Sequence, residues 1–237
     1  MRPVGVDGCR AGWIAVGDIG DHIEIHVHTT FKELLEHWSR ADRIFVDIPI
    51  GLPYQEKPQR SCDQQARQWL GPRASSVFSP PCRAAATATT IEAARELNLR
   101  EMDRSLSAQA WGICRKIAEV DQTLQINPAD RSRVYEVHPE VCFWALANGT
   151  AMHHSKKTPA GRAERTKLLN AWEPKTQVLL QAVMTGYRRS EVQTDDVLDA
   201  LVALVTARAE SEALRATPNQ PESDQNGLPM QMMYRAA

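Results

Sequence analysis

Residues 4–16 read VGVDGCRAGWIAV, and this stretch decides the fold. Apolar residues on both sides of the turn-forming segment 7–12 are typical of a β-hairpin, and Asp7 stands at the end of its first strand. Residues 22–28 then alternate polar with apolar side chains, as expected of a half-buried strand with Ile23, Ile25 and Val27 on one face. The N-terminal segment therefore predicts three short antiparallel strands.

A helix and a buried strand are predicted next. Thr30 and Glu33 form a capping-box pattern at the start of an amphipathic segment. Residues 43–48, RIFVDI, make a short apolar run that ends before Pro49, which favours a central strand buried on both faces. Asp47 lies at the end of that strand.

Residues 49–105 are rich in proline, and we interpret them as an insertion or a cover over an active site, with one short helix at 62–70. Further elements are expected from apolar periodicity and capping residues: a helix at 107–125, a strand at 133–137, helices over most of 139–190, and a helix from 195 to about 214 capped by Thr194.

The C-terminal residues 215–237 are expected to form a tail. Within it, residues 217–227 are predicted to be a linker or surface loop, and residues 230–234 an edge strand. The element order indicates one α/β domain that spans residues 1–237.

The composition excludes several classes of protein. The chain has 237 residues, of which 43% are hydrophobic and 24% charged, so collagen-like, disordered and coiled-coil proteins are excluded. The net charge is -1, so no general basic coat for nucleic acid is present. No apolar run reaches the roughly 18 residues of a membrane helix, and no leader pattern is seen. Five widely spaced cysteines suit reduced thiols, so we expect a cytoplasmic protein without a membrane partner; whether it forms homo-oligomers stays open.

Carboxylates are the residues that indicate chemistry. Asp7 and Asp47 would lie side by side if their strands pair, and they would repel each other unless a cation lies between them. Asp196 and Asp199 are three residues apart and share a helix face. The helix dipole explains Asp196, but Asp199 flanks an apolar stripe and favours a function. Glu136, inside the apolar strand at 133–137, is a further catalytic candidate.

This oxygen-rich set predicts Mg²⁺ or Mn²⁺, held by Asp7, Asp47, Asp196 and Asp199 in a site for one or two cations. The histidine and thiolate sets typical of zinc are not evident, and His138 is interpreted as an ordinary histidine at a strand end. Two basic loops, at 56–83 and 155–167, suit contacts to phosphate. The substrate-binding residues that they predict are Arg60, Arg67, Arg73, Ser75, Ser76, Arg83, Lys156 and Lys157.

Several motifs together resemble an uncharacterised bacterial and archaeal domain family described as a predicted ribonuclease-H-like nuclease. They are VGVDGCRAGWIAV, VDIPIGLP, the segment from RSCDQQAR to SSVFSPP, KIAEVD, EVHPE, SKKTPAGR and DDVLDAL, and they span about residues 4–210. The resemblance implies a ribonuclease-H-like fold, which is a five-stranded mixed sheet flanked by helices, here with a helical or loop insertion after the fourth strand.

The resemblance also implies roles for individual residues. Asp7 matches the acidic residue of the first strand, and Asp47 the one at the end of the fourth. Asp196 and Asp199 match the acidic pair of the closing helix, in a pattern similar to that of Holliday-junction resolvases. Glu136 belongs to the family's own motif, and the glutamate that ribonuclease H carries on its first helix has no clear counterpart here.

The function expected from these residues is a metal-dependent nuclease, a hydrolase that acts on DNA or RNA. One alternative is a non-catalytic nucleic-acid or nucleotide binding protein of the same fold. A second is a phosphotransferase of the actin and sugar-kinase type, for which 237 residues leave little room.

Overall fold

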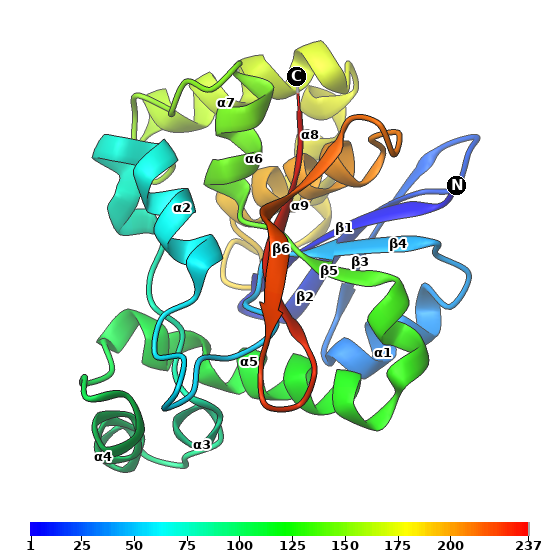
Figure 1. The fold of residues 1–237 in the computed structure, drawn as a ribbon. Helices are drawn as coiled ribbons and strands as arrows, with labels where there is room; N and C mark the ends of the chain where they lie inside the picture. Colours follow the sequence, from blue (N-terminus) through cyan, green and yellow to red (C-terminus); the bar gives the residue numbers. More distant parts are fainter. Residues whose placement is uncertain (237) are drawn as a thin grey trace.

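The computed structural model describes residues 1–236 and contains a five-stranded mixed sheet flanked by helices (Figure 1). The first three strands are antiparallel neighbours, and two parallel strands extend the sheet on the other side. This confirms the predicted α/β class, the hairpin and the central strand. In spatial order the strands are β3 (Ile23–His28), β2 (Gly12–Asp18), β1 (Pro3–Cys9), β4 (Arg43–Val46) and β5 (Val134–Glu136).

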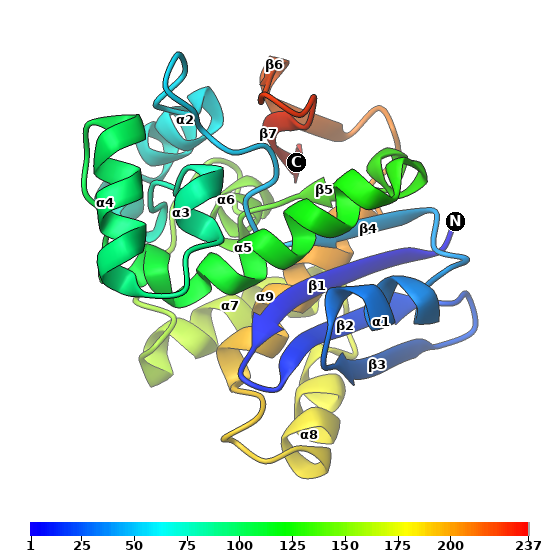
Figure 2. The ribbon, with the colours of Figure 1, turned by 90° about the horizontal axis from the view of Figure 1, so that it is seen from below.

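Helices cover both faces of this sheet. One face carries α1 (Phe31–His37) and α5 (Ala108–Ile126), and Figure 2 looks onto it. The other face, which we call the α9 face, carries α6 (Pro139–Leu146), α7 (Pro159–Trp172), α8 (Thr176–Gly186) and α9 (Thr194–Ala207). Side chains alternate between the two cores along each strand, because successive residues of a strand point to opposite faces. Val6, Trp13 and Val46 join the α1/α5 core, whereas Ile14 and Phe45 join the α9 core.

Helix α9 lies closer to β1 than a side chain would permit. A Cβ atom on Gly5 would come within 2.1 Å of the Leu204 nitrogen and 2.2 Å of the Ala200 oxygen. A glycine at this position lets the two backbones touch, and the small residues Ala200 and Ala203 face the contact. The position of α9 along β1 is therefore fixed by a close backbone approach.

The segment between β4 and α5 is more helical than expected. It contains the predicted short helix, α2 (Ser61–Leu70), followed by a 3₁₀ turn at Gly71–Ser76, α3 (Arg83–Ala86) and α4 (Ile91–Met102). Helix α4 was not predicted, although Thr90 caps it by accepting a hydrogen bond from the Ala93 backbone N–H. In Figure 1 these elements lie on the side of the molecule towards which the carboxyl ends of β1 and β4 point.

Two expectations for the C-terminal part are wrong. Helix α9 ends at Ala207, about seven residues earlier than predicted, because the Arg43 guanidinium donates to the carbonyl oxygens of Ala207 and Ala209 (both 2.8 Å) and so caps its end. The stretch predicted as a linker belongs to a two-stranded sheet of β6 (Leu214–Ser223) and β7 (Pro229–Arg235).

The prolines that suggested a linker lie where the β6–β7 pairing is interrupted. The register shifts between Thr217 and Glu222, so Pro218 and Pro221 fall in a stretch without regular ladder bonds. The predicted strand at 230–234 is confirmed as part of β7. It pairs with β6 and touches the main sheet through one parallel bridge between Val137 and Met233.

Within residues 1–236, no helix combines the length and the apolar character needed to cross a membrane. The five cysteines of the described chain are buried and free of disulfide bonds.

The contact at Gly5 predicts a large effect of a very small substitution. Gly5→Ala should lower the free energy of unfolding by about 2 kcal/mol or more, because the new methyl group displaces α9 from β1. Urea denaturation measures the change. Gly112→Ala is the matched control: its Cβ would meet nothing within 4 Å in the described chain, so it should stabilise helix α5 by about 0.5–1 kcal/mol. Equal stability of Gly5→Ala and the wild type would contradict the close approach.

Candidate metal-binding active site

Strand register brings two carboxylates to one face of the sheet. Asp7 lies two residues after Gly5 in β1, so both residues are on the face of the sheet that packs against α9. Asp47 comes directly after β4 and two residues after Phe45, so it lies on the same face as Phe45, which belongs to the α9 core. Val6 pairs with Val46, and the Asp47 N–H donates to the Val6 carbonyl oxygen (3.0 Å), so Asp7 and Asp47 are neighbours at the carboxyl ends of two parallel strands.

The N-terminal half of α9 adds two more carboxylates. Asp199 is almost completely buried, with 1% of its surface exposed, and Asp7 is exposed by 8%. Asp196 also caps the helix, because its Oδ2 atom accepts a hydrogen bond from the Gln193 N–H (2.8 Å). Gln193, not the predicted Thr194, is thus the N-cap, and the Asp196 carboxylate also lines the cavity described below.

The electrostatics of the cluster disfavour negative charge. Burial raises the pKa of Asp7 well above its usual value, and repulsion from Asp47 and Asp199 raises it further. Burial also raises the pKa of Asp47 and of Asp199 to about 6, against the opposing attraction of Lys156. The pKa of Asp196 is raised to about 6, again mainly by burial. Four carboxyl groups therefore share a volume in which additional positive charge would stabilise their ionised forms.

Lys156 supplies one positive charge to this cluster. Its ammonium group donates to Asp199 Oδ2, and the attraction of Asp199 raises the pKa of Lys156. The other oxygen of Asp199, Oδ1, is buried and has no hydrogen-bond partner among residues 1–236. A buried carboxylate oxygen without a donor is costly unless a cation binds it. The donor set of oxygens alone fits Mg²⁺ or Mn²⁺.

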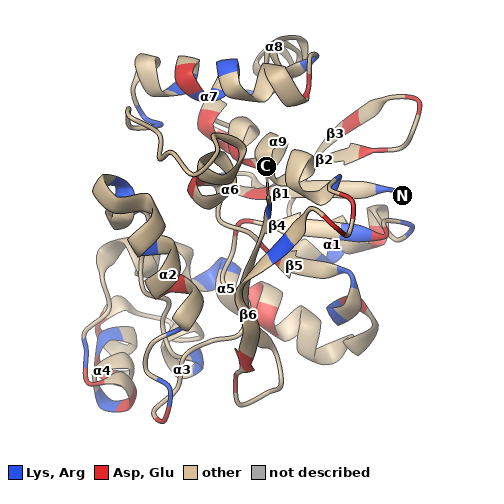
Figure 3. Ribbon diagram, turned by 45° about the horizontal axis from the view of Figure 1, so that its top comes forward, with Lys and Arg blue, Asp and Glu red and all other residues tan. Residues whose placement is uncertain are grey.

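A cavity of about 810 Å³ opens onto these carboxylates. It is lined from several elements: Asp7 to Arg10 of the first hairpin, Asp47 to Pro49 after β4, the 3₁₀ turn, α5, the start of α6, the loop at 155–157, and Gln193 and Asp196. Figure 3 shows acidic segments near β1 and β4 and basic segments on α5 and α7 around them. The cavity therefore combines an acidic floor with a partly basic rim.

Glu136 does not belong to this cluster. It pairs with Val46 across β4 and β5, so it points to the α1/α5 face, opposite to Asp7 and Asp47. Its two carboxylate oxygens accept from Nη2 of Arg60 (2.6 and 2.7 Å), and one also accepts from the Ile50 N–H (2.6 Å). The structure therefore does not bring Glu136, expected to be catalytic, or Arg60, expected to bind substrate, to the carboxylate cluster: Arg60 is exposed by only 1%, and the two form a buried ion pair.

The other predicted substrate-binding residues divide into two groups. Arg67 donates to the Val77 carbonyl and to Ser79, and Arg83 makes a bidentate pair with Asp121 and also contacts Asp224. These two arginines hold the insertion through these contacts and are not among the residues that line the cavity. The remaining predicted residues line the cavity: Arg73, Ser75, Ser76, Lys156 and Lys157.

The cavity lining also includes Lys116, His138 and Glu140, to which the sequence assigned no role in the site. Lys116 of α5 donates to the Gly12 carbonyl and lies over the Trp13 ring, 4.3 Å from its centroid. His138 has Nε2 3.3 Å from the Ser76 carbonyl oxygen, and burial lowers the pKa of its ring. Glu140 holds the fully buried Arg165 in a bidentate pair (2.6 and 2.7 Å). The motifs KIAEVD and EVHPE contain all three cavity residues, but their spacing alone does not indicate a role.

The Glu140–Arg165 pair explains how the Lys156 loop is held. Arg165 Nη1 also donates to the carbonyl oxygens of His154 (3.0 Å) and Gly161 (2.9 Å). Arg73 donates to the same His154 carbonyl (3.1 Å). The loop that carries Lys156 is therefore fastened from two sides, and this positions the ammonium group at Asp199.

Comparison with known proteins identifies a family but no activity. A family model described as "Protein of unknown function (DUF429)" matches residues 5–223. No curated protein matches the chain. No solved structure matches it.

The position of Glu136 predicts a structural role that is separate from metal binding. Glu136→Gln removes the closer of the two buried carboxylates that pair with Arg60, the other being Asp63 at 3.7 Å, so the free energy of unfolding should fall by about 3 kcal/mol. Urea denaturation measures this loss, and calorimetric titration with Mg²⁺ should give the same affinity as the wild type. A weaker Mg²⁺ affinity with unchanged stability would place Glu136 in the metal site instead.

The raised pKa values predict how stability depends on pH without divalent cations. Between about pH 4 and pH 6 the folded carboxyls hold more protons than the unfolded ones, whose pKa is near 3.8, so rising pH should lower the free energy of unfolding. Excess Mg²⁺ should restore more stability at about pH 7.5 than at about pH 5, because protons compete with the cation. Thermal melts measure both effects.

Asp199→Asn is the variant that tests this assignment. It should flatten the pH dependence and remove most of the stabilisation by Mg²⁺. Because other groups also titrate in this range, the informative quantity is the difference between the wild type and the variant. Identical pH profiles for the two proteins would contradict the assignment of the raised pKa to this cluster.

Proposed function

The chain belongs to the DUF429 family, whose function is unknown, and we propose from its carboxylate site that it is a divalent-metal-dependent nuclease of ribonuclease-H-like fold. The observation that carries the proposal is the convergence of Asp7, Asp47 and Asp199 on the α9 face of the sheet. Their pKa values are raised, and one oxygen of Asp199 lacks a partner within the described residues.

The fold supports the ribonuclease-H-like part of the proposal. The resemblance implied a five-stranded mixed sheet with helices on both faces, and acidic residues on the first strand, the fourth strand and the closing helix. The sheet has this form, and the matching residues Asp7, Asp47, Asp196 and Asp199 lie at one cavity or in contact with its wall. Because one fold serves many activities, the site has to carry the functional argument.

Each residue of the site has a proposed role in phosphodiester hydrolysis. Asp7, Asp47 and Asp199 would hold Mg²⁺ or Mn²⁺, with Asp196 at the edge of the set. A bound divalent cation would supply Lewis acidity and lower the pKa of a water molecule. Lys156 orients Asp199 and offers positive charge beside the carboxylates. Arg73 and Lys157, on the rim of the cavity, are placed to contact the phosphates of a substrate.

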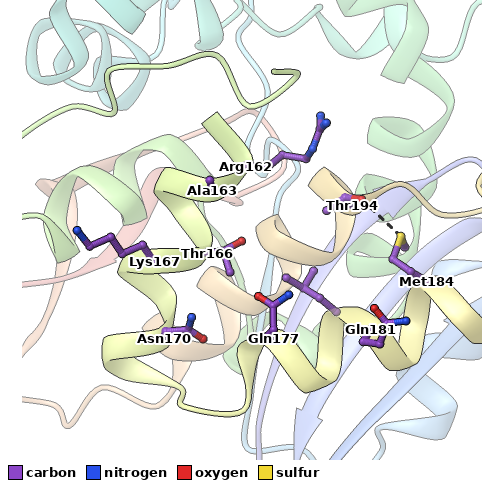
Figure 4. A pocket seen from close by; sticks show the side chains of 10 residues that line it. Arg162, Ala163, Thr166, Lys167, Asn170, Gln177, Gln181, Met184 and Thr194 are labelled. Atoms are coloured by element: carbon purple, nitrogen blue, oxygen red, sulfur yellow. Dashed lines mark hydrogen bonds between the residues drawn. The ribbon is translucent and has the colours of Figure 1, made fainter. Parts of the chain in front are cut away.

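The surface beside the site favours a polymer over a mononucleotide. The main cavity shares Arg10 and Gln193 with a neighbouring cavity of about 460 Å³ that also contains Arg162 and Arg189. That cavity in turn shares Arg162 and Thr194 with one of about 560 Å³ between α7 and α8 (Figure 4). We call these three cavities the basic groove.

The charge of the basic groove suits a polyanion. Away from the carboxylate site it is lined by Arg10, Arg162, Lys167 and Arg189, with Asp195 as the acidic residue that the lining includes. Its other lining residues are mainly uncharged and polar, such as Gln177 and Gln181. Contacts of this kind position a nucleic-acid backbone without reading its sequence.

Two carboxylate variants test the proposal. Asp7→Asn and Asp199→Asn should each lower the Mg²⁺-dependent cleavage rate by at least about 100-fold, because each removes a charged ligand. The assay uses purified full-length protein and a panel of single-stranded, double-stranded and branched DNA and RNA. Asp21→Asn, in the exposed β2–β3 turn, is the control and should cleave at the wild-type rate.

Three other results would overturn the proposal. Cleavage that survives in both carboxylate variants would indicate a contaminating nuclease. Salt-sensitive binding without turnover under Mg²⁺ or Mn²⁺ would indicate a binding protein. Hydrolysis of ATP by the wild type that is lost in Asp7→Asn would indicate a phosphotransferase.

A further inference from the structure

Five metal-ligating side chains gather on the other face of the sheet, away from the carboxylate site. His22, Glu24, His26 and His28 alternate along the segment HIEIHVH, which forms the edge strand β3 and the turn before it. His37 is the last residue of α1. We call these five residues the histidine cluster.

Register places the histidine cluster on the α1 side. His26 pairs with Ala15 and His28 pairs with Trp13, and both partners belong to the α1/α5 core. Glu24 pairs with Gly17, whose missing side chain leaves room for the Trp38 ring directly after α1. Asp7 and Asp47 face α9 instead, so the sheet itself separates the two groups of residues.

Three side chains of the cluster, Glu24, His26 and His37, lie within reach of a single ion. The ring centroids of His26 and His37 are 4.3 Å apart, and those of His28 and His37 are 5.1 Å apart. Glu24 lies 3.5 Å from His26 Nε2 and 3.4 Å from His22 Nε2 through its two oxygens. One ligand atom from each of Glu24, His26 and His37 lies within 4.8 Å of the others.

We propose that Glu24, His26 and His37 form a binding site for a divalent transition-metal ion of the zinc type. Imidazole nitrogens combined with one carboxylate are a ligand set that zinc prefers and that Mg²⁺ does not. With metal–ligand distances of about 2.0–2.1 Å, tetrahedral geometry separates ligand atoms by about 3.3–3.4 Å. The Glu24–His26 distance of 3.5 Å is already close to this value. Small rotations of the exposed His37 side chain would bring its ring nitrogen to the same distance from the other two ligand atoms.

His28 provides a second, independent observation. Its Nε2 atom is buried, yet it has no hydrogen-bond partner in the part of the chain that the structure describes. A buried nitrogen without a partner calls for an explanation, and its ring lies 5.1 Å from that of His37, so His28 is the candidate for a fourth ligand after a change of its side-chain rotamer. With His28 the set has four protein ligands, as structural zinc sites do, and the ion would join α1 to the edge strand β3.

Zinc titration of metal-free, full-length protein tests the site. The probe is Zn²⁺ alone, followed by calorimetry in the Asp199→Asn background so that the carboxylate site contributes little. We expect one tightly bound ion, a raised melting temperature on zinc addition, and no displacement by excess Mg²⁺. Replacing both His26 and His37 by Ala should weaken zinc binding by about 100-fold or more and remove the thermal shift.

The matched control is a second exposed pair of histidines. His153→Ala with His154→Ala removes two imidazoles far along the chain from the cluster and should leave zinc binding unchanged. His37→Ala alone, at an exposed position, keeps the test valid if the double variant does not fold, and should still weaken binding by at least about tenfold.

Two outcomes would overturn the site. One is no zinc bound by the wild type at stoichiometric concentration, and the other is equal zinc affinity in the wild type and both cluster variants. A visible-absorption titration with Co²⁺ gives a second readout, because nitrogen coordination in a tetrahedral site gives intense bands that the cluster variants should lack. These results are independent of nuclease activity.

Discussion

The backbone contact between β1 and α9 at Gly5 is the constraint on which the carboxylate site depends. Because no side chain separates the two elements, α9 is held at one height above the strand, with Ala200 and Leu204 against Gly5. The helix then carries Asp199, one residue before Ala200, and Asp196, one turn earlier, towards the end of β1 where Asp7 lies. A wider spacing would admit a side chain at residue 5 but would move Asp199 away from Asp7 and Asp47. The glycine at position 5 thus allows both the close packing of α9 on β1 and the proximity of Asp199 to Asp7 and Asp47.

The burial of several carboxylates side by side opposes folding, because like charges repel. The surrounding structure offsets this repulsion with a positively charged side chain held in a fixed position. Lys156 contacts Asp199, and its loop is fastened by Arg165 and Arg73 through the His154 carbonyl. Arg165 is itself neutralised by Glu140, so it holds the loop without adding net charge to the cluster. The ammonium group of Lys156 therefore offsets only part of the negative charge that the four carboxylates carry when they are ionised. A site that binds and releases a divalent cation needs such an excess of negative charge.

The sequence predicted those parts of the molecule that depend on local pattern. Alternation and strand ends were enough to bring Asp7 and Asp47 together, and helical spacing paired Asp196 with Asp199. Glu136 was misplaced because its face depends on the register between β4 and β5, which a strand of three residues does not reveal. In the sequence Arg60 and Arg83 look like any basic loop residues, because their ion-pair partners, Glu136 and Asp224, lie in distant segments of the chain. The hairpin of β6 and β7 was missed because prolines at an irregular pairing look like those of a linker. The histidine cluster was missed because His37 comes from another element.

The two faces of one sheet therefore carry two different ligand chemistries, and this governs how metal dependence should be interpreted. Carboxylate oxygens on the α9 face favour Mg²⁺ or Mn²⁺, whereas the histidine cluster on the α1 side favours zinc. Under the two proposals, a chelator strong enough to strip both ions would lower stability and activity together, although the carboxylates, not the histidines, lie at the cavity. Zinc retained through purification is then no evidence for zinc-dependent catalysis. Activity restored by Mg²⁺ in a protein that keeps its zinc assigns chemistry to the carboxylates, and a melting temperature restored by zinc without activity assigns a structural role to the histidines. The sheet that separates the two sites is what makes these effects separable.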